Sequence, residues 1–163
     1  MTKTIENNIL IPFQAEQLRE GKDVIFTPTG VSMRPFIEGG KDAVVLRKLP
    51  EVRIGDIILA AVQPPTSNSV AVQPPTAQRS NIRYVLHRVI AIDGENVTLM
   101  GDGNIGTTEH CTLVDVLGTV IRIENAHGRR KPLTKGRLWY HLRRWRKIML
   151  KVYRKLLKLK ILE

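Results

Sequence analysis

The 163-residue sequence contains a single cysteine, Cys111, which excludes an internal disulfide framework and a cysteine-based zinc cluster. Its longest wholly apolar run, residues 57–62, is far shorter than the roughly 20 residues that a membrane-spanning helix needs. Residues 1–6 contain no apolar segment of the kind found in secretory signals. These absences predict a protein of the cytoplasm, or one bound peripherally to the cytoplasmic membrane.

Acidic residues are scarce in one part of the chain. The net charge is +11, yet residues 128–163 contain 14 Lys or Arg and one acid, whereas residues 1–127 contain 12 Lys or Arg and 14 acids. A partner attracted by charge would therefore be attracted by the C-terminal tail. The length, with 42% hydrophobic and 25% charged residues, fits one compact globular domain. We expect a domain over residues 1–127 and a basic tail over residues 128–163.

The domain is expected to be mostly β, because six short runs rich in Val, Ile and Leu are separated by turns that contain Gly and Asp. The runs are residues 24–27, 43–47, 57–62, 82–92, 97–100 and 113–123. Asp93-Gly94-Glu95-Asn96 is expected to join the fourth and fifth runs as a hairpin. A short helix is expected over residues 13–21, which end in a glycine.

A repeated proline-rich segment interrupts the β pattern. The hexapeptide Ala-Val-Gln-Pro-Pro-Thr occurs at residues 61–66 and again at residues 71–76. Its prolines cannot belong to a central strand. Residues 61–80 are therefore expected to form an exposed loop lengthened by local duplication, with a Pro-rich docking segment as the alternative.

The tail predicts a basic amphipathic helix, in which apolar residues recur at spacings of three and four and Lys or Arg fill most of the other face. The apolar stripe consists of Leu138, Leu142, Trp145, Met149, Val152, Leu156 and Leu159. An anionic membrane surface would accept both the stripe and the cations. The alternatives are packing on the rest of the protein, self-association, and nucleic acid, which is the least supported because no base-stacking module accompanies the charge.

Four short segments of the domain contain chemistry-bearing residues. Thr29-Gly30-Val31-Ser32-Met33-Arg34-Pro35 holds a serine between a glycine and a proline, and Ile54-Gly55-Asp56 opens a buried strand. Tyr84-Val85-Leu86-His87-Arg88-Val89-Ile90 holds a histidine within a strand, and Gly101-Asp102-Gly103-Asn104 forms a turn after the next strand. Taken singly, these are two ordinary turns, a structural histidine and a loop. Their order along the chain is the informative feature.

Together the four segments resemble the signal peptidase I and LexA-like family of serine peptidases. The matching boxes are Ser32-Met33-x-Pro35, Gly55-Asp56-Ile57, Tyr84-x-x-His87-Arg88-Val89-Ile90 and Gly101-Asp102-x-Asn104, within about residues 24–123. The resemblance implies a coiled, mostly β catalytic fold, to which this chain adds the basic helix. A histidine stands where the better-known bacterial members have a lysine, as in the archaeal and endoplasmic-reticulum branch.

The resemblance implies that Ser32 is the nucleophile, His87 the general base and the Ser32 backbone N–H an oxyanion donor. A serine hydroxyl needs a neighbouring base that is neutral near pH 7, and histidine meets this need without the desolvation that lysine requires. Some members have a hydroxyl two residues before the nucleophile. Gly30 occupies that position here, and Thr29 is the candidate replacement.

The residue that orients the base has two candidates. The family's histidine branch places an aspartate several residues after the Gly-Asp-x-Asn turn, but Thr107 and Thr108 occupy the corresponding stretch. Asp102, within the turn, and Glu109, just after the threonines, are the acids that remain for this role.

We therefore expect a serine endopeptidase of the signal-peptidase-like type, which processes a peptide or protein at a membrane surface. The alternatives are a self-cleaving LexA-like regulator and a non-catalytic binding module. The 28 residues before the serine segment are too few for the helix-turn-helix of such a regulator. No cofactor or metal is expected, because His110, Cys111 and His127 lack metal-ligand spacing and no Gly-rich phosphate loop precedes a helix.

Overall fold

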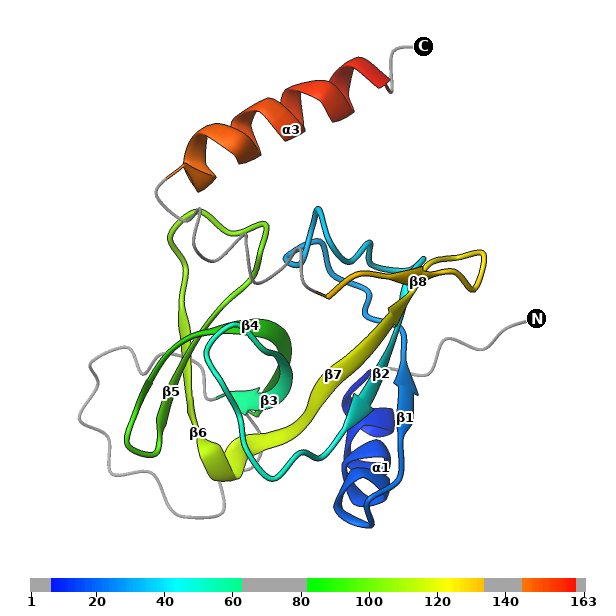
Figure 1. Ribbon diagram of the computed structural model, residues 1–163, viewed down its shortest axis with the longest axis vertical. Coiled ribbons are helices and arrows are strands. Elements are labelled where there is room, and N and C mark those ends of the chain that lie inside the picture. The colour runs from blue at the N-terminus through cyan, green and yellow to red at the C-terminus, as the bar shows by residue number, and fades with distance from the viewer. Residues whose placement is uncertain (1–6, 63–81, 134–144, 161–163) are drawn as a thin grey trace.

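The computed structural model describes residues 7–62, 82–133 and 145–160. These residues form a mostly β fold, in which a curled antiparallel sheet makes a half-barrel (Figure 1). The strand order is β1-β2-β7-β3-β4-β5-β6, and β8 pairs with β7. The strands are β1 (Val24–Phe26), β2 (Ala43–Arg47), β3 (Ile57–Val62), β4 (Arg83–Asp93), β5 (Asn96–Met100), β6 (Glu109–Thr112), β7 (Val116–Glu124) and β8 (Arg130–Lys131).

The centre of the sheet is buried on both faces. In β3 the side chains of Ile57 and Leu59 join one hydrophobic cluster, and those of Ile58 and Ala60 join a second cluster. Because successive side chains of a strand point to opposite faces, this alternation places one cluster on each side of the sheet. A strand buried on both faces has a continuous apolar sequence rather than an alternating one, which explains the run at 57–62.

The expected hairpin is confirmed, since β4 and β5 pair antiparallel with Asp93 opposite Asn96. Gly94 lies at the turn with a φ of 56°, a left-handed conformation that glycine adopts without the steric cost of a side chain. The register shifts between Val89 and Ala91, so β4 contains an irregularity on its way to the turn. The hairpin carries the strand that holds His87 and leads into the Gly101-Asp102 turn.

The N-terminal helix is longer than expected. It is α1 (Asn7–Arg19), with Pro12 inside it, whereas the sequence predicted a start after that proline. The helix ends at Arg19, and the chain turns away from it at Gly21, whose φ is 79° and whose amide donates a hydrogen bond to the carbonyl of Leu18. Leu18 is fully buried against Gly118 of β7, where an added Cβ would lie 3.1 Å from the leucine side chain. α1 contacts β7 and β1, and Figure 1 shows it at the lower end of the sheet.

The predicted strand over residues 113–123 is partly wrong. Residues Leu113–Asp115 form a single 3-10 turn (η2), and β7 starts at Val116. The carboxylate of Asp115 accepts hydrogen bonds from the amide and hydroxyl of Thr112, which closes this turn. The two strands that the sequence did not predict, β6 and β8, have polar sequences and are recognisable only by their backbone pairing to β5 and β7.

The tail contains α3 (Arg146–Lys160), which begins later than the predicted stripe, whose first residue is Leu138. Residues 134–144 and 63–81, which include most of the proline-rich segment, lie outside the described residues. The loop expected over residues 61–80 is wrong at its first two residues, because Ala61 and Val62 belong to β3 and pair with β4. Within the described ranges, no helix has both the length and the apolar character required to cross a membrane. Figure 1 shows α3 at one end of the long axis, with α1 towards the other.

Candidate active site

Ser32 and His87 meet in the folded protein. The hydroxyl Oγ of Ser32, in the loop between β1 and β2, lies 2.8 Å from Nε2 of His87 in β4. His87 is 5% exposed, so its ring is held in a packed environment rather than in free solvent. Ser32 is partly accessible. The pair thus combines a reachable hydroxyl with a base fixed at hydrogen-bonding distance, as proton transfer requires.

Glu109 contacts the other nitrogen of the same ring. Its Oε2 lies 2.5 Å from Nδ1 of His87. Glu109 is the first residue of β6 and pairs with Leu99 of β5, which in turn neighbours β4. With a carboxylate on Nδ1, the histidine keeps its proton there and presents the lone pair of Nε2 to Ser32. The structure therefore brings Ser32, His87 and Glu109 together in one chain of contacts, with the histidine between the hydroxyl and the carboxylate.

Arg83 contacts the outer oxygen of that acid, and sequence reasoning missed it. Its guanidinium lies 3.1 Å from Oε1 of Glu109, so the two carboxylate oxygens have different partners. Arg83 and His87 are four residues apart in β4. Strand side chains alternate with a period of two, so these two share a face. This spacing was the available signal for Arg83 in the sequence.

Asp102, the other candidate orienter, is placed differently. Its two carboxylate oxygens accept hydrogen bonds of 2.8 and 2.6 Å from Arg88, and both side chains are buried. Arg88 also donates to the carbonyl of Gly55 at 2.7 Å. The arginine thereby connects the Gly55-Asp56 turn to the Gly101–Asn104 turn. The contacts of Asp102 are those of a residue that holds two turns together, while Glu109 occupies the position on the histidine.

The Gly101–Asn104 turn lies directly against the backbone of Ser32. The amide of Gly103 donates a 2.6 Å hydrogen bond to the carbonyl of Ser32. A Cβ added to Gly101 would lie 2.6 Å from that carbonyl oxygen and 3.0 Å from Nε2 of His87. Glycine is therefore required at 101, because a side chain there would collide with the Ser32 loop and approach the His87 ring.

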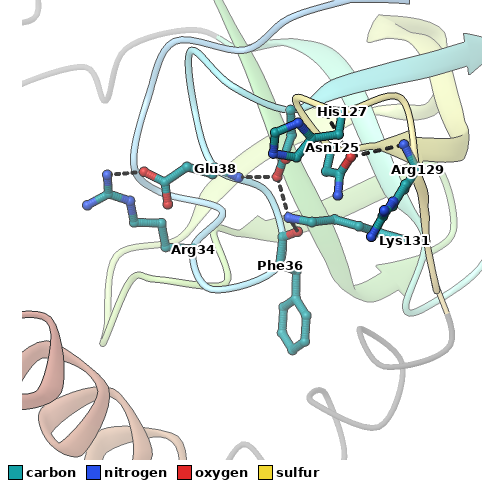
Figure 2. Close-up of polar contacts among 8 residues, drawn as sticks. Arg34, Phe36, Glu38, Asn125, His127, Arg129 and Lys131 are labelled. Carbon is teal, nitrogen blue, oxygen red and sulfur yellow. Dashed lines mark hydrogen bonds and ion pairs between the residues drawn. The ribbon is translucent and has the colours of Figure 1, made fainter. Parts of the chain in front are cut away.

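A polar cluster anchors the far side of the serine loop (Figure 2). The Asp42 carboxylate is 2.6 Å from the amide of Glu38 and 2.5 Å from Nζ of Lys131, on β8. Lys131 also donates to the carbonyl of Phe36 at 3.2 Å, and Arg34 forms an ion pair with Glu38. Asp42 is 2% exposed, so the cluster ties the loop that follows Ser32 to the sheet through a buried charge.

The site opens into a cavity of about 590 Å³. Ser32, His87 and Glu109 line it together with apolar side chains from α1, β1 and β3, and Thr29 and Gly30 border it beside the serine. Among the described residues, no acceptor is found for the backbone N–H of Ser32. The cavity has the size and the mixture of apolar walls and a few polar groups that are typical of a ligand site.

Comparisons with protein-family models, with curated proteins and with solved structures find no match to this chain.

Proposed function

We propose that the protein is a serine endopeptidase with the coiled β fold of the signal peptidase and LexA-like family. The observation that carries the proposal is the chain of contacts from Ser32 through His87 to Glu109, with heavy-atom distances of 2.8 and 2.5 Å. Four sequence segments in the family's order supply the side chains and turns around these contacts. A histidine base between a hydroxyl and a carboxylate is the arrangement that activates a serine for attack on an acyl carbon.

In the first half of the reaction, Oγ of Ser32 forms a bond to the carbon of the scissile peptide carbonyl, and its proton passes to Nε2 of His87. Glu109 accepts the hydrogen bond from Nδ1 and stabilises the imidazolium that results. The imidazolium then gives its proton to the amide nitrogen, the C–N bond breaks, and the amine fragment leaves. The remaining fragment stays bound to Ser32 as an ester.

In the second half, a water molecule attacks the ester carbon and gives a proton to His87. The C–Oγ bond breaks, and the proton returns to Ser32, so enzyme and base are regenerated. The backbone N–H of Ser32 is the donor assigned to the developing oxyanion in both halves. One such donor is typically worth about 2.7–4 kcal/mol of transition-state stabilisation.

A proteome-derived peptide mixture tests the proposal on many candidate substrate sequences at once. The purified full-length protein is incubated with the mixture, and new peptide termini are identified by mass spectrometry for the wild type, Ser32→Ala and His87→Ala. His110→Ala is the matched control, because His110 lies next to Glu109 in β6 but is exposed and bonds Thr98. The wild type and His110→Ala are expected to create the same new termini, and the two site variants none.

Two results would overturn the proposal. Identical termini in the wild type and in Ser32→Ala would assign any cleavage to a contaminant. A folded wild-type protein that creates no termini in peptides or in its own chain would favour the non-catalytic binding module. Intact-mass measurement identifies the self-cleaving alternative, in which the wild-type chain is cut at a rate independent of its concentration and Ser32→Ala is not.

A further inference from the structure

The helix α3 exposes an apolar stripe that no described residue covers. This exposed stripe contains Ile148 in addition to residues of the predicted one. The exposed fractions are 62% for Trp145, 57% for Ile148, 54% for Val152, 59% for Leu156 and 39% for Met149. Leu150, by contrast, is 1% exposed. The helix therefore has an inward-facing side at Leu150 and a separate apolar side that faces solvent.

These exposed residues share one face of the helix. At 100° per residue, positions 145, 148, 149, 152 and 156 fall within an arc of about 100°. Trp145 lies at the start of the helix, where its carbonyl accepts the amides of Ile148 and Met149. Lys151 and Lys155 are exposed and border the stripe on one side. The stripe thus has an aromatic residue at one end and flexible cations along its edge.

The charge of α3 selects the kind of partner. Its fifteen residues include seven Lys or Arg and no acid, so the helix has no internal ion pairs that would offset its self-repulsion. Two such helices face to face would bring like charges together, which disfavours a second copy of the chain as the occupant. Nucleic acid would neutralise the cations but would leave the exposed Trp, Ile, Val and Leu in water. An anionic bilayer satisfies both features, since apolar side chains enter the acyl region while cations meet the headgroups.

We propose that α3 binds in the interface of an anionic phospholipid bilayer, with Trp145, Ile148, Val152 and Leu156 inserted and Lys151 and Lys155 at the level of the headgroups. The long lysine side chains can extend to the phosphates from a helix that lies in the plane of the membrane. Leu150 stays on the side of the helix that faces the protein. This binding is independent of catalysis, because none of these residues contacts Ser32, His87 or Glu109 among the interactions of the described chain.

Sedimentation of the full-length protein with vesicles measures the proposed binding. Vesicles of phosphatidylcholine with about one third phosphatidylglycerol are compared with vesicles of phosphatidylcholine alone, at low and high salt. The protein is expected to partition into the anionic vesicles at least about tenfold more strongly, and salt is expected to weaken the binding. Ser32→Ala is expected to bind like the wild type, so failure of the peptidase proposal leaves this result unchanged.

Paired variants assign the binding to the two features of α3. Ile148→Ser with Val152→Ser removes apolar area without changing charge and is expected to weaken partitioning at least about tenfold. Its matched control is Ile25→Ser with Val114→Ser, since these residues are 64% and 83% exposed on the β domain. Lys151→Gln with Lys155→Gln is expected to abolish most of the preference for anionic vesicles, and Lys22→Gln with Lys41→Gln to leave it intact.

A spectroscopic measurement locates the helix in the bilayer. In a Trp139→Phe variant, Trp145 is the one remaining tryptophan, and its fluorescence is expected to be quenched by lipids brominated on the acyl chain. Equal binding by the Ile148→Ser/Val152→Ser variant, or no quenching of Trp145, would overturn the proposal. A wild-type dimer in light scattering that this double variant converts to a monomer, without vesicle binding, would assign the stripe to a second copy.

Discussion

Arg83 and Glu109 form an ion pair of 3.1 Å at the carboxylate oxygen that His87 does not contact. The Glu109 side chain is 12% exposed, and one of its carboxylate oxygens contacts the Arg83 guanidinium while the other contacts the His87 imidazole. The arginine can only donate, while Nδ1 of the histidine can donate or accept. The orientation of the carboxylate and the tautomer of the histidine are therefore linked through Arg83, which is a positioning residue for the proposed reaction.

This link predicts the effect of Glu109→Gln. The amide oxygen is expected to face Arg83, which leaves the NH₂ group pointing at Nδ1 of His87. The ring proton then moves to Nε2, where it faces Ser32 and prevents the histidine from accepting the serine proton. An orienting acid replaced by its amide typically lowers kcat about 10⁴-fold. We expect a loss of that order in kcat, with KM and the thermal unfolding midpoint nearly unchanged.

A second substitution tests the role of Arg83 in that loss. In Arg83→Leu/Glu109→Gln the donor is gone, so the amide can rotate and offer its oxygen to Nδ1. We expect the double variant to have a higher kcat than Glu109→Gln alone, measured on the peptide with the fastest cleavage. A purely structural role for Arg83 would give the opposite result, with the double variant slower than either single variant.

Asp102→Ala is expected to lower the free energy of unfolding, while the contact between Ser32 and His87 is largely retained. The substitution leaves the buried guanidinium of Arg88 without its carboxylate, and loss of one partner of a buried pair costs about 3–5 kcal/mol. Urea unfolding measures the change in free energy. The matched control is Asp23→Ala, which removes an exposed partner of Arg47 and is expected to lower the free energy of unfolding much less, because water screens an exposed ion pair. Equal losses in the two variants would contradict this assignment.

Gly101→Ala is expected to displace Ser32 or His87 in the proposed active site. Its methyl group would lie 2.6 Å from the Ser32 carbonyl, so the serine loop or the turn must move. A displacement of about 1 Å at a reacting group can lower the rate about 10²-fold. Gly106→Ala is the control, because an added Cβ there meets no atom within 4 Å. We expect near-normal kcat/KM for Gly106→Ala and a loss of about two orders of magnitude for Gly101→Ala.

The thiol of Cys111 predicts a contribution to stability that depends on pH. The pKa of Cys111 is raised to about 11 in the folded protein. Burial of the thiol is the larger cause, and the negative charge of Asp115 is the smaller one. An unfolded cysteine loses its proton near pH 8.5. Between these values the unfolded chain binds fewer protons, so stability falls as pH rises. The thiol is only partly desolvated, which limits the size of this effect. Between pH 7 and pH 10 we expect the free energy of unfolding of the wild type to fall by about 1 kcal/mol more than that of Cys111→Ala, which lacks the thiol.

Chemical modification gives an independent check on the same thiol. Iodoacetamide reacts with the thiolate, so a raised pKa and a buried side chain both slow alkylation. We expect Cys111 to react at least about tenfold more slowly at pH 8 in the folded protein than in urea. Similar rates in the two conditions would show that the residue is accessible in the native state.

Much of the fold was predictable because its signals are local. Strands β2 and β3 have the predicted bounds, and the hairpin at Gly94 follows from turn residues between two apolar runs. The polar strand β6 was missed, because Glu-His-Cys-Thr has no apolar periodicity and becomes a strand by pairing with β5. The 3-10 turn before β7 was missed for a related reason, since its signal is one side-chain contact from Asp115 to Thr112 rather than a pattern of hydrophobicity.

The sequence by itself determined the mostly β character, the position of the hairpin and the two residues, Ser32 and His87, proposed as nucleophile and base. It left the orienting acid open between Asp102 and Glu109, and only the tertiary structure decided which one contacts His87. The reason is strand register. Leu99 pairs with Glu109, and a slip of one residue would turn the side chains of β6 to the opposite face of the sheet and carry Glu109 away from the histidine.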